Sequence, residues 1–236
     1  MVGSRRVIVN ADDFGQSHGI NRGVIEAHQR GIVTSTSLMV RWPAAVEAGT
    51  YARGHTDLGL GLHFDLGEWA CRAGAWRPVY KVVRPGDRVA VEAELARQLA
   101  DFRTLVGREP SHIDSHQHAH LREPVRSVLL AVAHDLGVPL RRCNDRVHYV
   151  GDFYGQTADG APLPEAITRS GLVRLPTELP AGVSEIGCHP GYVDDLDTMY
   201  REERAQEVAV LCDPAVRDTV GAMGIVLTSF AALDGQ

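Results

Sequence analysis

Two adjacent carboxylates, Asp12 and Asp13, follow directly after an apolar run at residues 7–9 in the segment RRVIVNADDFGQSHG. Like charges this close raise each other's energy and shift each other's pKa values. Such a pair usually serves a cation, acid–base chemistry or the N-terminus of a helix. Ser17, a better N-cap residue, stands a little further on and can begin the next helix by itself. We therefore expect the two carboxylates to serve chemistry.

Histidines gather at three further places where a β-rich run gives way to a turn. GLHFD carries His63, EIGCHPGY carries His189, and SHIDSHQHAH carries a run of alternating polar residues. Residues two apart in an extended backbone point to one face of a strand. The third segment therefore predicts one polar face made of His112, Asp114, His116, His118 and His120.

One carboxylate and two imidazoles around a divalent ion are a common catalytic set that leaves positions open for water and substrate. Asp13, His63 and His116 can supply such a set. Asp12 would then be free to take a proton from a metal-bound water, and His189 could give a proton to a leaving group.

Three more polar residues of the histidine-rich segment fall outside this set. We expect Asp114 to accept a hydrogen bond from a ligand imidazole, and His118 or His120 to line the pocket or to support a ligand. The sequence leaves open which of these two histidines contacts substrate. Each residue alone is also compatible with a helix cap, a core side chain or a solvated loop, but their occurrence together at four strand ends indicates a site.

The elements that must position these residues alternate between β-rich and helical along most of the chain. Strands are predicted at 6–10, 35–40, 58–64, 139–143, 183–188 and 224–229, and strand followed by loop over 111–120. Helices are predicted at 17–30, from Pro43, and at 87–106, 123–136, 199–211 and 214–223. Repeated βα units with short loops predict a parallel sheet or barrel with helices outside. Its site would lie at the C-terminal ends of the strands.

The segment from Asn144 to Pro164 breaks this alternation because it is rich in Gly, Asp and Pro. Long loops of this kind are often functional. We expect a single domain over residues 1–236, with a lid or insertion loop around 144–170.

The composition excludes several classes of protein. The chain has 236 residues, 44% of them hydrophobic and 23% charged, as in ordinary globular proteins. A net charge of −6 offers no basic surface for nucleic acid or for an anionic membrane. No run approaches the ~20 apolar residues of a membrane span, no signal-peptide pattern is present, and the four cysteines form no C-x-x-C pair. We expect a soluble cytoplasmic protein.

Four motifs in order, VNADDFG, GLHFDL, HIDSHQHAH and EIGCHPG, resemble the YdjC-like carbohydrate deacetylase family, some of whose members remove acetyl groups from chito-oligosaccharides. The resemblance extends to GIVTSTSLMV and to the C-terminal region, so it covers most of the chain. It implies an α/β fold, a distorted (β/α) TIM-like barrel of the polysaccharide-deacetylase type, with one divalent metal ion. It also implies Asp12 as general base, His189 as general acid, and Asp13, His63 and His116 as metal ligands.

The metal, the substrate and the assembly are less closely defined. Two imidazoles and a carboxylate suit Zn²⁺, Mn²⁺, Co²⁺ or Fe²⁺, and the resemblance adds Mg²⁺. It implies a small acetylated amino sugar as substrate, whether a chito-oligosaccharide, a glycolipid or a cell-wall fragment, and a homodimer. Many relatives have a histidine where this chain has Gln117. On a strand, that side chain would point away from the ligands.

Two alternatives remain. A metal-dependent phosphoesterase or amidohydrolase would usually need a second metal, for which His118 and His120 offer spare ligands. An inactive sugar-binding barrel would have lost Asp12 or a metal ligand, and this chain keeps all of them.

Overall fold

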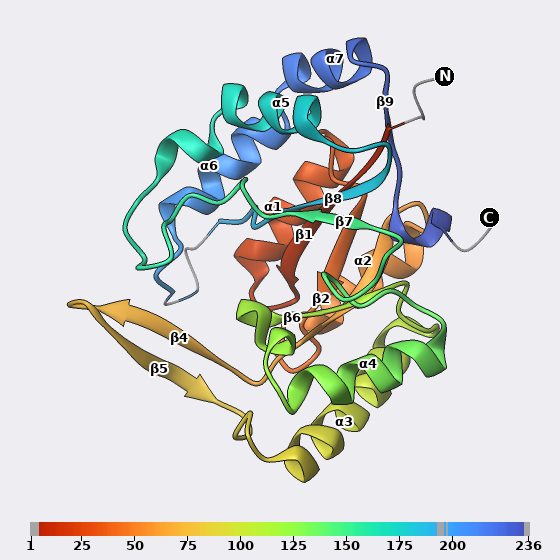
Figure 1. The fold of residues 1–236 in the computed structure, drawn as a ribbon, viewed down its shortest axis with the longest axis vertical. Coiled ribbons are helices and arrows are strands. Elements are labelled where there is room, and N and C mark those ends of the chain that lie inside the picture. Colours follow the sequence, from red (N-terminus) through yellow and green to blue (C-terminus); the bar gives the residue numbers. More distant parts are fainter. Residues whose placement is uncertain (1–4, 193–195, 197, 234–236) are drawn as a thin grey trace.

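A curled parallel sheet runs through the centre of the protein, with helices around its outside (Figure 1). The computed structural model describes residues 5–192, 196 and 198–233. In these residues the sheet has seven strands, ordered β6-β3-β2-β1-β8-β7, with β9 added beside the start of β1. They are β1 (Arg5–Phe14), β2 (Ser35–Leu38), β3 (Gly59–Phe64), β6 (Ile113–Ser115), β7 (His148–Val150), β8 (Gly182–Cys188) and β9 (Ile225–Leu227). The result is a half-barrel, which confirms the predicted fold class.

The helices surround this sheet (Figure 1). One group lies beside β7 and β8 and consists of α5 (Arg169–Glu178), α6 (Glu202–Leu211) and α7 (Pro214–Ala222). The other helices are α1 (His18–Gln29), α2 (Ala45–Gly54), α3 (Arg88–Val106) and α4 (Val125–Leu136), with short 3₁₀ turns η1 (His116–Leu121), η2 (Pro164–Ile167) and η3 (Phe230–Leu233). Among the described residues, no helix has both the length and the apolar character needed to cross a membrane.

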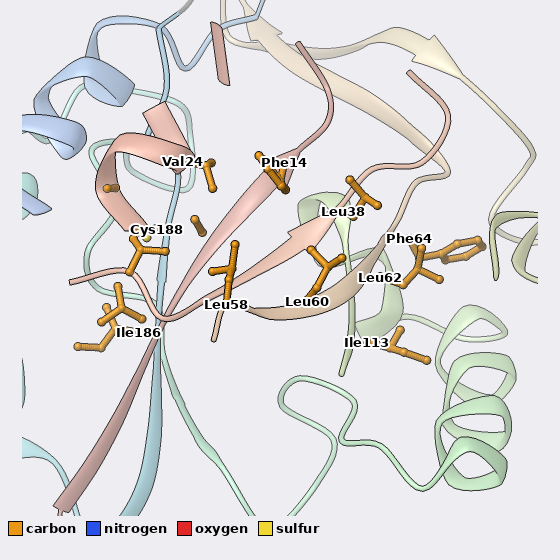
Figure 2. Packing of buried hydrophobic residues seen from close by; sticks show 14 of the residues in the cluster. Phe14, Val24, Leu38, Leu58, Leu60, Leu62, Phe64, Ile113, Ile186 and Cys188 are labelled. Atoms are coloured by element: carbon orange, nitrogen blue, oxygen red, sulfur yellow. The ribbon is translucent and has the colours of Figure 1, made fainter. Parts of the chain in front are cut away.

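The central strands are buried along almost their whole length, because helices and neighbouring strands cover both of their faces. Every residue of β3 is buried, and so are the last eight of β1. Figure 2 shows the side chains of Leu58, Leu60 and Leu62 beside those of Phe14 and Leu38 in one continuous apolar layer. This core holds the strand ends at which the polar residues begin.

Local sequence signals set several helix ends, and the N-cap at Ser17 was predicted. The Ser17 hydroxyl accepts the N–H of Ile20 at the start of α1, and the Asp87 carboxylate accepts the N–H of Ala90 at the start of α3. Gly107 and Gly137 end α3 and α4 in the left-handed conformation that glycine tolerates. The predicted helices at 17–30, 87–106 and 123–136 are therefore confirmed to within a few residues.

Three predicted elements are wrong in detail. The helix after Pro43 begins only at Ala45. The strand at 139–143 is reduced to one bridge between Leu140 and Ile113. The histidine-rich run is extended only to Ser115 and then turns into η1, so the expected alternation of side chains stops at that residue.

A hairpin that was not predicted projects from the body of the protein and consists of β4 (Gly67–Arg72) and β5 (Ala75–Lys81) (Figure 1). Its base is held by the buried Asp65 carboxylate, which accepts the Tyr80 hydroxyl at 3.0 Å and the N–H of Gly67 at 2.9 Å. Unpredicted α5 and β7 also lie in the second half of the chain. Residues 144–170 contain β7 and η2, and their role as a lid stays a prediction.

A close backbone contact joins α1 to the loop after β8, which carries His189. A Cβ added at Gly23 would lie 2.4 Å from the Cα of Gly191. Real Cβ atoms do not come so close to backbone, so only glycine lets this loop lie against the helix.

We expect Gly23→Ala to destabilise the protein, although Gly→Ala inside a helix usually stabilises by ~0.5–1 kcal/mol. Overpacking against backbone typically costs about 1–3 kcal/mol. Gly221→Ala is the matched control, because a Cβ at that helical glycine meets nothing within 4 Å. Urea unfolding should show a lower midpoint for the first variant and an unchanged or higher one for the second. Equal midpoints would contradict the contact.

Candidate active site

The end of β1 brings both adjacent carboxylates into one buried site. Neighbouring residues on a regular strand point to opposite faces. Here the register of β1 against β2 shifts between Ala11 and Phe14, and Asp13 has a left-handed φ of 66°. Aspartate tolerates this conformation better than most residues. Because the alternation is broken, Asp12 and Asp13 both reach His63, and both are buried.

Asp13, His63 and His116 come together as predicted for metal ligands. The Oδ1 atom of Asp13 lies 3.2 Å from Nε2 of His63 and 3.0 Å from Nδ1 of His116. All three ligand atoms lie within 4.8 Å of one another, and all three residues are buried. An ion with ligand bonds of about 2.0–2.2 Å keeps neighbouring ligand atoms about 3 Å apart. The donor set and its spacing therefore fit a divalent metal ion.

Asp114 sets the orientation of the His63 ring. Its Oδ1 atom lies 2.7 Å from Nδ1 of His63, and the Ser37 hydroxyl lies 3.1 Å from the same nitrogen. An Nδ1–H that donates to Asp114 leaves the lone pair on Nε2, which faces Asp13. This carboxylate–histidine arrangement is typical of metal-binding imidazoles. Asp114 thus has the supporting position that the sequence predicted for it.

The electric field at this point favours positive charge. Burial lowers the pKa of His63, but Asp114 and the neighbouring aspartates outweigh burial and raise that pKa to about 10. Burial also lowers the pKa of His116, but Asp13 outweighs burial and raises that pKa well above its ordinary value. Nε2 of His116 lies 3.8 Å from a carboxylate oxygen of Glu68, which raises the pKa further. A bound cation would supply the charge that these carboxylates attract.

Arg141 is the main residue of the site that the sequence did not reveal. Its side chain is fully buried and binds the Asp12 carboxylate through two nitrogens, at 2.6 and 2.7 Å. The same guanidinium lies 2.8 Å from Asp114 and 2.6 Å from Glu185. One guanidinium therefore pairs with three carboxylates, and two of these, Asp12 and Asp114, have oxygen atoms within 4.8 Å of a His63 nitrogen.

Arg141 decides which of these carboxylates is ionised. Burial alone would raise the pKa values of Asp12 and Asp114, but Arg141 outweighs burial and lowers both. At Glu185 the effect of burial is larger than that of Arg141, so the pKa of this carboxyl is raised to about 7. The only signal for this residue in the sequence was a cation in the run PLRRC, which had been expected to be an ordinary strand.

His189 lies on the other side of Asp12. Its Nε2 atom is 3.8 Å from Oδ2 of Asp12, and its ring contacts the rings of Tyr154 and Tyr200 edge-on. Burial lowers the pKa of His189 to about 4. The imidazole is therefore neutral at pH 7 and can accept a proton before it donates one.

His118 and His120 do not join the cluster of Asp13, His63 and His116. The His120 ring lies between the Ser115 hydroxyl at 2.6 Å and the backbone carbonyl of Arg141 at 3.1 Å, so it helps to place Arg141. His118 has a left-handed φ of 52°, and its Nε2 lies 3.4 Å from the Tyr149 hydroxyl. Gln117 is also left-handed, and its amide makes two hydrogen bonds to the backbone of Trp69. Its side chain is therefore directed at the backbone of β4, from a left-handed turn and not from a strand.

The fold is that of the carbohydrate esterases known as family 4. A family 4 carbohydrate esterase from Streptomyces lividans superimposes with a TM-score of 0.57 at 13% identity, over 96% of this chain and 93% of that one. A crystal structure from Enterococcus faecalis, described as a cellobiose-phosphate cleavage protein, superimposes with a TM-score of 0.77 at 27% identity, over 98% and 99%.

The sequence matches the family model of the YdjC-like proteins over residues 6–222, so the chain belongs to that family. A carbohydrate deacetylase of Geobacillus stearothermophilus is 34% identical, with 96% of this chain and 97% of that protein covered. A chitooligosaccharide deacetylase of Serratia marcescens is 33% identical, with 96% and 98% covered. The resemblance noted in the four motifs is thereby confirmed.

We expect Arg141→Gln to lower the free energy of unfolding at pH 7 by about 3–5 kcal/mol, because it leaves buried carboxylates without a counter-ion. The loss should shrink at pH 5, where the released carboxylates take up protons. Arg141→Lys keeps the charge and should lose less. Urea unfolding at both pH values measures these changes, and equal losses in the two variants would contradict the role of the charge.

The buried Glu207 predicts a pH dependence of stability. Burial, which outweighs the hydrogen bonds from Tyr200 and from the N–H of His189, raises its pKa to about 8. The folded protein then holds a proton that the unfolded chain releases above pH ~4.3. Stability from this group is complete below that pH and is lost as pH rises to about 8. Between pH 5 and 9 the free energy of unfolding should fall, by on the order of a few kcal/mol.

Glu207→Gln should flatten that fall, whereas Glu202→Gln, an exposed change on the same helix, should leave it as in the wild type. Chemical unfolding at pH 5, 7 and 9 makes the comparison. A profile in Glu207→Gln as steep as the wild type's would assign the proton to another group.

Proposed function

We propose that this protein is a metal-dependent deacetylase that hydrolyses the N-acetyl group of an amino sugar and releases acetate and the free amine. The observation that carries the proposal is the different environment of two adjacent carboxylates. Asp13 faces two imidazoles, His63 and His116, whereas Asp12 faces Arg141 and His189. One carboxylate is thus placed to hold an ion and the other to handle a proton.

Asp13, His63 and His116 would hold one divalent ion, which when bound polarises the acetyl carbonyl and lowers the pKa of a water towards ~7. The mixed nitrogen and oxygen ligands are compatible with Zn²⁺, Mn²⁺, Co²⁺ or Fe²⁺, and family membership keeps Mg²⁺ as a candidate.

Asp12 would take the proton of the attacking water. Arg141 lowers the pKa of this carboxyl, so Asp12 is ionised at neutral pH and ready to accept a proton. The Asn10 amide donates to its Oδ1 at 2.9 Å, which further fixes its direction. Groups that act as general base typically contribute about 10²–10⁴-fold in rate.

His189 would deliver a proton to the departing amine. Because its pKa is lowered to about 4, it is neutral before the reaction and must first receive the proton that it donates. Asp12, whose Oδ2 lies 3.8 Å from Nε2 of His189, is placed to pass on the proton taken from water. The two groups then work in sequence on one proton. Asp114 would keep His63 oriented, and His118 would line the pocket.

The relatives support a carbohydrate substrate, since they are named carbohydrate and chitooligosaccharide deacetylases. We include in the proposal a single domain with a lid over 144–170, a homodimer and a cytoplasmic location.

Arg141 argues for one metal ion rather than two. A second group of possible ligands consists of Asp12, His63 and Asp114, but both of its carboxylates bind the Arg141 guanidinium. A phosphoesterase with two metals would need this place for a second ion. The inactive sugar-binding alternative does not explain why Asp12 keeps a full set of polar partners.

The test is acetate release from N,N′-diacetylchitobiose by the metal-loaded protein. We expect release by the wild type, no release after treatment with a chelator, and recovery when metal is added back. Asp12→Asn should lower the rate by at least about 10²-fold with one metal still bound per chain. Asp135→Asn is the control, because this carboxylate is 81% exposed on α4 and lies outside the site.

Release by Asp12→Asn at the wild-type rate would refute the assigned base. A wild type that binds one metal but releases no acetate would refute this substrate. Two metals per chain with phosphatase activity would favour the phosphoesterase.

A further inference from the structure

A second buried arginine, Arg204 on α6, holds the other aspartate. Its Nη2 atom lies 2.6 Å from Oδ2 of Asp13, the oxygen that faces away from the two imidazoles. The Arg204 side chain is 3% exposed and that of Asp13 is 2% exposed, so water competes little for this contact. The two oxygens of Asp13 therefore have different partners, a guanidinium for one and imidazoles for the other.

Arg204 also ties Asp13 to the loop of His189. Its Nη1 donates to the backbone carbonyl of His189 at 3.3 Å, and its Nε donates to the carbonyl of Tyr200 at 3.1 Å. The N–H of Gly191 donates back to the carbonyl of Arg204 at 3.3 Å. One side chain thus joins the end of β1, the loop after β8 and the first turn of α6.

We propose that Arg204 is a positioning residue that restricts Asp13 to one oxygen as a metal ligand and holds that ligand in register with His189. With Oδ2 bound to the guanidinium, only Oδ1 is presented to an ion. Binding through both oxygens would fill a position that the reaction needs for water or for the acetyl carbonyl. The positive charge of Arg204 beside the ion also lowers the affinity of the site for the metal.

This inference rests on the proposed function only in taking Asp13 as a metal ligand. It makes a prediction opposite to that of a purely structural residue. Loss of a structural residue loosens the site and weakens metal binding. Loss of Arg204 removes a repelling charge and frees the second carboxylate oxygen, so metal binding should strengthen.

The experiment uses Co²⁺ as the probe with the full-length chain. Arg204→Met keeps side-chain length without charge or donors, and Arg204→Lys keeps the charge should the first variant fold poorly. We expect Arg204→Met to bind Co²⁺ at least about tenfold more tightly than the wild type. The visible absorption of its Co²⁺ should weaken, since a second Asp13 oxygen raises the coordination number. Its kcat for deacetylation should fall, and Arg204→Lys should stay near the wild type in affinity.

Arg5→Met is the matched control, because Arg5 also donates to two backbone carbonyls, those of Pro176 and Met223, at the opposite end of β1. It should change neither Co²⁺ affinity nor the spectrum. Weaker Co²⁺ binding by Arg204→Met, or an unchanged spectrum, would overturn the proposal. If the predicted changes occur but no acetylated sugar is hydrolysed, the proposed substrate is refuted, whereas the proposed role of Arg204 is supported. If the wild type binds no Co²⁺, both the proposed metal site and the proposed role of Arg204 are refuted.

Discussion

The rest of the site depends on the ion pairs that the buried Arg141 guanidinium makes with three carboxylates. Asp12, Asp114 and Glu185 come from three different strands and meet where water is excluded. Buried carboxylates at such distances would normally take up protons or force the strands apart. Arg141 lies between them with contacts of 2.6–2.8 Å and keeps Asp12 and Asp114 ionised. The orientation of His63 by Asp114 follows from this ionisation.

The two adjacent aspartates, Asp12 and Asp13, each pair with a different arginine. Arg141 binds both oxygens of Asp12, whereas Arg204 binds only the outer oxygen of Asp13. The first pair holds a carboxylate in one ionisation state and one direction. The second leaves a single oxygen directed at the imidazoles. Neighbouring residues of the same type thereby acquire different chemistry from their counter-ions, and a bend in the backbone at Asp13 makes this possible.

The sequence predicted which residues would meet where these residues follow strand ends. Asp13, His63 and His116 were predicted as one cluster because parallel strands direct their C-terminal ends to one edge, and the structure brings them within 4.8 Å. The alternation expected from His112 to His120 was wrong. It assumed an extended backbone, but Gln117 and His118 are left-handed, so the chain turns at His116. His120 consequently contacts the backbone carbonyl of Arg141 and is not part of the cluster of Asp13, His63 and His116.

The sequence alone determined the βα alternation, the helix cap at Ser17 and the types of residue at each strand end, because these depend on periodicity and on neighbours along the chain. Only the tertiary structure decided which cation meets which carboxylate. Arg141 lies 129 residues from Asp12 and Arg204 lies 191 residues from Asp13, and nothing in their local sequence distinguishes them from surface arginines. Their roles arise from burial, since a charge removed from water must find its partner in space, wherever that partner lies in the chain.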